Sequence, residues 1–258
     1  GSVYSSQARF QTGSMNDSWE AHVAILDTLQ EELVAPASGG GGGTAVQAAF
    51  QLELADMACC VPTHMGGCGE RVETMKFETF VIHATTPVLQ QAAARNRSMN
   101  FDELVKVARE ERAGSCRTEG CAKKGLRKEQ ELRNHPGVVT VGLVWASARA
   151  PRETINAVLD SIDPYIDVHK MFCRPATAAR REEVVAARLR GMFCYYGQHY
   201  VACFYNSDVG QWLTFDDAKV RRVGPHWRDA LEKIRKGRLQ PSLLQQRRRQ
   251  AQQQQASL

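Results

Sequence analysis

The sequence has no apolar run that approaches the roughly 20 residues a membrane helix requires. No charged, apolar and small-residue signal pattern follows Gly1, and no segment repeats at a fixed period. We therefore expect an intracellular protein, cytoplasmic or nuclear or both, with no membrane partner. Its 258 residues suffice for one large domain or two small ones, and we expect the chain to begin within a longer protein.

Aromatic residues are missing from the C-terminal end, residues 245–258, which combines three consecutive arginines with a run of glutamines. This composition predicts a disordered, solvated tail. Nucleic-acid-binding segments interleave basic residues with aromatic rings that stack on bases. A nucleic-acid partner is therefore not expected.

The chain has eight cysteines and no secretory signal, and this combination favours metal ligands or free thiols over disulfides. Cys173, Cys194 and Cys203 lie in apolar surroundings and are expected to be small core residues. Two other pairs have the spacing of a tetrahedral zinc site. The predicted ligands are His64, Cys68, Cys116 and Cys121, with Cys60 as the alternative to His64. The remaining alternative is a set of cysteines that binds no metal.

Apolar periodicity predicts the α+β class, with helices in the first half and strands in the second. The first helix is expected at 17–34, because Asp17 and Glu20 form a capping-box pattern and Pro36 stops it. A flexible glycine insert follows at 39–43. Further helices are expected at 101–107, 151–162 and 227–236, the last ended by Gly237. Strands are expected at 76–83, 138–145, 192–196, 200–205 and 212–215.

One histidine and one aspartate stand at matching ends of two predicted strands. Residues 206–210, NSDVG, form a turn that makes these strands an antiparallel hairpin. In a hairpin the start of one strand lies near the end of the next, so His199 and Asp216 are predicted neighbours. A carboxylate beside an imidazole fixes its tautomer and stabilises the imidazolium, as in a nucleophilic triad. The alternative is a surface ion pair.

Several segments resemble those of the ubiquitin-specific protease family. The histidine box of that family is similar to residues 191–200, GMFCYYGQHY, and the next box to residues 212–220, WLTFDDAKV. The Gln-x-Asp box is similar to residues 9–20, although Met15 replaces the usual Gln. Further counterparts are the segments 139–145, 224–227 and 237–241. The likeness is greatest to one branch of the family. That branch contains large plant proteins called ubiquitin carboxyl-terminal hydrolase-related and animal members often labelled inactive.

The resemblance implies a papain-like α+β fold with thumb, palm and fingers. Residues 1–50 would form an incomplete thumb with the glycine insert, and residues 51–137 the fingers, with zinc at their tip. Residues 138–244 would form the palm, and residues 245–258 the tail.

The resemblance also implies roles for three residues. His199 would be the general base that activates a thiol, Asp216 would orient His199, and Asp217 would be a supporting acceptor. The Asn-x-Cys box of the nucleophile is missing from the chain, and no cysteine has that context. We therefore expect the nucleophile upstream of Gly1 and this segment alone to be inactive.

The implied function is thiol-dependent hydrolysis of peptide and isopeptide bonds at the C-terminus of ubiquitin. The partners would be ubiquitin or polyubiquitinated proteins. The alternative is a catalytically inactive ubiquitin-binding or scaffold pseudoprotease.

Overall fold

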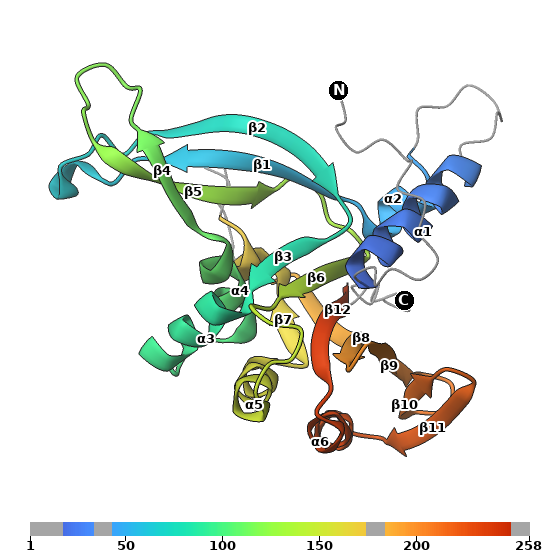
Figure 1. Ribbon diagram of the computed structural model, residues 1–258. Coiled ribbons are helices and arrows are strands. Elements are labelled where there is room, and N and C mark those ends of the chain that lie inside the picture. The colour runs from blue at the N-terminus through green and yellow to red at the C-terminus, as the bar shows by residue number, and fades with distance from the viewer. Residues whose placement is uncertain (1–17, 34–42, 174–183, 249–258) are drawn as a thin grey trace, which may run out of the picture.

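The computed structural model describes residues 18–33, 43–173 and 184–248 (Figure 1). The predicted cap Asp17, residues 9–17 of the Gln-x-Asp box, the glycines 39–42 and the end of the tail lie outside these residues. Within them, none of the helices combines the length and apolar character that crossing a membrane takes.

The described residues form helices and strands in a mixed order. The helices are α1 (Ser18–Leu33), α2 (Ala45–Phe50), α3 (Thr86–Arg95), α4 (Phe101–Arg109), α5 (Arg152–Ser161) and α6 (Trp227–Gly237), with short 3-10 turns η1 (Thr63–Met65) and η2 (Val168–Met171). The strands are β1 (Leu52–Cys59), β2 (Arg71–Thr79), β3 (Ile82–Thr85), β4 (Glu111–Ser115), β5 (Lys124–Leu132), β6 (Val138–Val144), β7 (Tyr165–Asp167), β8 (Ala186–Tyr196), β9 (His199–Asn206), β10 (Gln211–Asp216), β11 (Lys219–Gly224) and β12 (Gln240–Arg248).

The strands build two sheets. The smaller sheet has the order β2-β1-β5-β4 and projects away from the helices (Figure 1). The larger sheet has the order β11-β10-β9-β8-β12-β6-β3, with β7 paired to β8 off that path. All pairs are antiparallel except β3 with β6. The larger sheet carries His199 and Asp216. The smaller sheet ends near four of the eight cysteines, Cys60, Cys68, Cys116 and Cys121.

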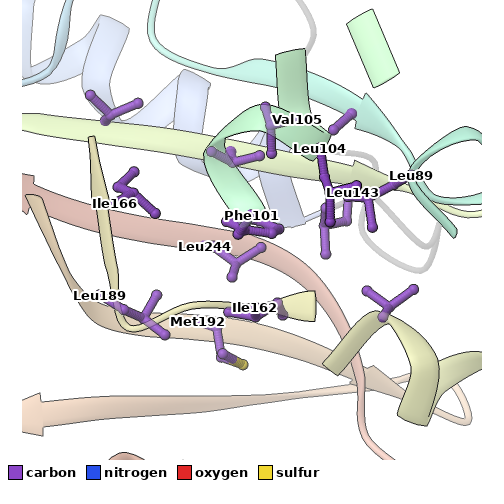
Figure 2. Packing of buried hydrophobic residues seen from close by; sticks show 14 of the residues in the cluster. Leu89, Phe101, Leu104, Val105, Leu143, Ile162, Ile166, Leu189, Met192 and Leu244 are labelled. Carbon is purple, nitrogen blue, oxygen red and sulfur yellow. The ribbon is translucent and has the colours of Figure 1, made fainter. Parts of the chain in front are cut away.

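The main core lies between the larger sheet and the helices α3, α4 and α5 (Figure 2). Helix α4 begins with a capping box, in which Asn100 and Glu103 satisfy each other's backbone amides. This start places Phe101, Leu104 and Val105 in the core, where each is almost completely buried. The larger sheet contributes Leu189, Met192 and Leu244 from β8 and β12. This core therefore supports the sheet that carries His199.

Residues 51–137, the predicted fingers segment, contribute strands to both sheets. Strand β3 pairs with β6 of the larger sheet, and α3 and α4 pack in the main core. The single strand predicted at 76–83 is in fact two, because the chain turns after Thr79 and leaves the smaller sheet. Only β1, β2, β4 and β5 form the projecting sheet. Cys173, Cys194 and Cys203 are buried, as predicted.

Two predicted boundaries near the C-terminus are wrong. Helix α6 includes Gly237, and Arg238 takes the left-handed cap with φ 52°. The tail was expected from residue 245, yet β12 continues to Arg248. Gln246 pairs with Leu189 on one side and Val139 on the other, and it is fully buried. Backbone pairing on both sides outweighs the polar composition that favoured disorder.

His22 is a polar residue on the buried side of α1. Its ring makes an edge contact with Phe50, and its Nε2 atom is buried with no hydrogen-bond partner among the described residues. Burial lowers the pKa of His22 below its ordinary value of 6.5. The unfolded chain therefore binds the proton more readily than the folded one.

We expect His22→Leu to raise the free energy of unfolding at pH 7 by about 1 kcal/mol, because a buried unpaired polar atom is removed. The wild-type protein should lose stability as the pH falls below about 6.5, where the unfolded histidine protonates first. The variant should lose less. Urea unfolding at pH 7 and pH 5 measures both effects. Parallel pH curves for the two proteins would contradict this account.

Candidate active site and cysteine cluster

His199 stands at the first position of β9, directly after a tight turn. Gly197 and Gln198 both have positive φ, 51° and 77°, as a two-residue type I′ hairpin requires. The turn pairs His199 with Tyr196 at the end of β8. The imidazole is therefore held at one end of the larger sheet, by a hairpin in which Gly197 adopts positive φ readily and Gln198 adopts it against its usual preference.

Asp216 is the last residue of β10, which pairs with β9 from Gln211 opposite Asn206 to Phe215 opposite Ala202. This register brings Asp216 Oδ1 to 2.7 Å from His199 Nε2. The predicted neighbourhood of the two side chains is confirmed. They are 39% and 48% exposed, so the pair is open to a substrate.

The electrostatics of the pair fix the tautomer of the imidazole. The hydrogen bond from His199 lowers the pKa of Asp216, with smaller help from Lys219 and Arg221. Asp216 is thus a carboxylate at neutral pH, and the Nε2–H group of His199 donates to it. The other ring nitrogen, Nδ1, is left as the proton acceptor.

Asp217 lies in the turn after β10, with φ 51°. Its Oδ1 atom is 4.0 Å from His199 Nδ1, which is too far for a hydrogen bond. Its side chain is 84% exposed. Asp217 therefore contributes a nearby negative charge and leaves Nδ1 open.

No cysteine of the described residues belongs to the group of side chains formed by His199, Asp216 and Asp217. Four of the cysteines gather elsewhere, at the end of the smaller sheet. The other four, Cys59, Cys173, Cys194 and Cys203, are buried. Burial raises the pKa of each of their thiols, that of Cys203 to about 12. Because the thiolate is the attacking species, these residues suit a structural role.

The cysteine cluster joins two loops at the tip of the smaller sheet (Figure 1). Cys60 and Cys68 flank η1 between β1 and β2, while Cys116 and Cys121 lie between β4 and β5. The four Sγ atoms lie within 4.8 Å of one another. The Sγ atoms of Cys60 and Cys121 are 3.8 Å apart, and those of Cys68 and Cys116 are 3.5 Å apart.

The cluster holds three of the predicted ligands, Cys68, Cys116 and Cys121, together with Cys60, which was the predicted alternative to His64. His64 lies on η1 with an exposed side chain, whereas the Cys60 amide donates to Glu70 and holds its thiol inside the knuckle. A Cβ at Gly67 would collide with the Val61 carbonyl and press on the Cys60 thiol, so the tight loop requires glycine there. The signal in the sequence was the place of Cys60 directly after an apolar strand.

The donor set fits a tetrahedral divalent metal. Bonds of about 2.3 Å from zinc to four thiolates place the sulfurs about 3.8 Å apart, close to the observed separations. The hydroxyl and amide of Thr118 lower the pKa of Cys116 to about 6. For Cys121 the Lys123 amide lowers the pKa, but desolvation and the neighbouring thiols outweigh it and raise the value to about 11. Four thiolates this close need a bound cation to balance their charge.

The chain is similar to known proteins over nearly its whole length. The family model described as "Ubiquitin carboxyl-terminal hydrolase" matches residues 2–255. Ubiquitin carboxyl-terminal hydrolase 54 of Mus musculus is 28% identical over 94% of this chain, and ubiquitin carboxyl-terminal hydrolase 53 of Homo sapiens is 26% identical over 93%. The chain spans 15% and 22% of the length of these relatives.

A chain of the SAGA Ubp8/Sgf11/Sus1/Sgf73 DUB module bound to ubiquitin aldehyde has a similar structure, with a TM-score of 0.62 and 15% sequence identity. The match covers 92% of the present chain and 50% of that chain. The predicted α+β, papain-like fold is thereby confirmed.

Proposed function

We propose, since this chain belongs to the ubiquitin carboxyl-terminal hydrolase family, that it supplies the general base of a thiol-dependent ubiquitin hydrolase. The bonds cleaved would be the peptide and isopeptide bonds at the C-terminus of ubiquitin. The observation that carries this proposal is the 2.7 Å hydrogen bond between His199 and Asp216, which leaves Nδ1 free to take a proton.

The residues support a two-step acyl transfer. A cysteine outside residues 1–258 gives its thiol proton to Nδ1 of His199 and attacks the carbonyl carbon of the terminal glycine. The imidazolium then gives this proton to the leaving amine, and a thioester to the cysteine remains. Water, deprotonated by Nδ1, attacks the thioester and releases the carboxylate and the thiol. Asp216 stays ionised throughout and stabilises the imidazolium.

The partners of this function would be ubiquitin and polyubiquitinated proteins. We assign the projecting sheet of β1, β2, β4 and β5 to the fingers that hold the body of ubiquitin. Its tip would be fixed by a structural zinc on Cys60, Cys68, Cys116 and Cys121. Zinc with four thiolates has no open position, so its contribution there is structural. The protein would act in the cytoplasm, the nucleus or both.

A second function is favoured by the cysteines themselves. Those outside the metal cluster are buried with raised pKa values, so the described residues offer no nucleophile to His199. If no other segment provides one, the domain would recognise ubiquitin without cleaving it.

One experiment separates the two functions. The full-length protein is treated with ubiquitin that carries an electrophile at its C-terminus, beside a His199→Ala variant. We expect a covalent adduct with the wild type and a much slower one with the variant. Lack of any adduct, together with binding of unmodified ubiquitin, would overturn the hydrolase and leave the pseudoprotease. Lack of both would overturn the two functions together.

A further inference from the structure

Three arginines gather at the end of the larger sheet that lies away from His199. Arg188 and Arg190 belong to β8, and Arg247 of β12 is the direct cross-strand partner of Arg188. The pairing with β7 sets Tyr165 opposite Arg188. This arginine cluster lies far from the candidate active site, because Tyr205, which it contacts, is six residues from His199 along β9. At about 3.3 Å per residue the separation is about 20 Å.

Two tyrosine rings contact the guanidinium groups of Arg188 and Arg190. The Cζ atom of Arg188 is 4.8 Å from the ring centroid of Tyr205 and 5.7 Å from that of Tyr165. The Cζ atom of Arg190 is 5.5 Å from the same Tyr205 centroid. Cation–π contacts of this kind cover the flat faces of the guanidinium and leave the N–H groups at its edge for other acceptors.

The positive charge of the cluster has no counterpart among the described residues. None of their Asp or Glu side chains forms an ion pair with Arg188, Arg190 or Arg247 within 4.0 Å. Desolvation lowers the pKa of Arg190, and the charges of Arg247 and Arg188 lower it further.

The arginines of the smaller sheet are arranged differently. Arg71 lies 3.5 Å from Glu131, and Arg133 lies 2.8 Å from Glu73 and 2.7 Å from Glu131. Three like charges held side by side cost free energy unless an anion joins them. The arginine cluster therefore has the electrostatics of an anion site.

We propose that this cluster binds a phosphorylated side chain of a partner protein. A phosphate monoester carries nearly two negative charges at neutral pH and accepts several charge-assisted hydrogen bonds from arginine forks. Arg247 is exposed and Tyr165 is 55% exposed, so a peptide can reach the site.

A nucleic acid fits this cluster less well. The tyrosine faces already carry guanidinium groups, and three cations in one compact group do not form the extended track that follows a phosphate backbone. The proposal does not depend on hydrolase activity.

The test uses the full-length protein and a fluorescent peptide with one phosphoserine between glycines and alanines. Fluorescence anisotropy is measured with this peptide, with its unphosphorylated form, and with inorganic phosphate as competitor. We expect the phosphopeptide to bind about tenfold or more tightly than its unphosphorylated form. Its binding should weaken as the salt concentration is raised. The R188Q/R190Q/R247Q variant should lose it. The matching lysine variant should lose most of it, because lysine keeps the charge without the fork.

The control variant R95Q/R97Q/R112Q removes the same charge from exposed positions elsewhere and should bind as the wild type does. Thermal unfolding of each variant shows whether the fold is retained. Equal binding by the wild type and the cluster variant would overturn the proposal. The proposal would also be overturned if the phosphopeptide did not bind. It would likewise be overturned if the phosphorylated and unphosphorylated peptides bound equally well and phosphate competed with both.

Discussion

Asp216→Asn should lower kcat/KM of the full-length protein for a fluorogenic ubiquitin C-terminal amide on the order of 10²–10⁴-fold. Asp216 Oδ1 accepts the Nε2–H of His199 at 2.7 Å, and this hydrogen bond lowers the pKa of Asp216, so the carboxylate is charged at neutral pH. An asparagine has no charge to stabilise the imidazolium, and its amide group can turn its NH₂ toward Nε2. The base nitrogen would then carry the proton.

The matched control is Asp217→Asn, one residue further along the chain. Its carboxylate is 4.0 Å from Nδ1 and 84% exposed, so we expect a change of about threefold or less. Thermal unfolding of both variants checks the hairpin. A large loss with Asp217→Asn and a small one with Asp216→Asn would reverse the roles assigned to the two aspartates.

Cys60→Ser should reduce the bound zinc from about one per chain to nearly none and destabilise the projecting sheet by more than about 3 kcal/mol. Structural zinc sites in small peptides supply roughly 10–16 kcal/mol of folding free energy, and a serine hydroxyl is a poor substitute for a thiolate. Apart from contacts of the thiols, a hydrogen bond from the Lys123 ammonium to the Met65 carbonyl joins the two loops. Metal analysis measures the zinc, and limited proteolysis between residues 60 and 121 measures the loss of order.

His64→Ala is the control, because His64 is exposed and lies outside the four-cysteine group. We expect this variant to keep its zinc and its resistance to proteases. Treatment of the wild type with a strong chelator should reproduce the effect of Cys60→Ser. Zinc loss with His64→Ala but not with Cys60→Ser would restore the ligand set predicted from the sequence.

The sequence by itself determined the hairpin that carries the candidate site. Alternating apolar residues at 200–205 and 212–215, joined by a short polar turn, allow one antiparallel pairing with a buried face. That register places His199 opposite the end of the next strand, so local pattern predicted a contact between residues far apart in the sequence. The segments 9–20, 191–200 and 212–220, which resemble the conserved boxes of ubiquitin-specific proteases, also indicated the family. The catalytic roles of the pair remain predictions.

Only the tertiary structure decided the features that depend on how segments meet in space. The 3-10 turn at residues 63–65 directs His64 outward, while the hairpin bond of Cys60 directs its thiol inward, and spacing alone treats both residues as suitable. Pairing of β3 with β6 moved residues 82–109 into the main core. Pairing of β12 with β8 ordered residues 245–248 and set Arg247 beside Arg188. Such contacts arise from packing among distant strands, which local propensity does not encode.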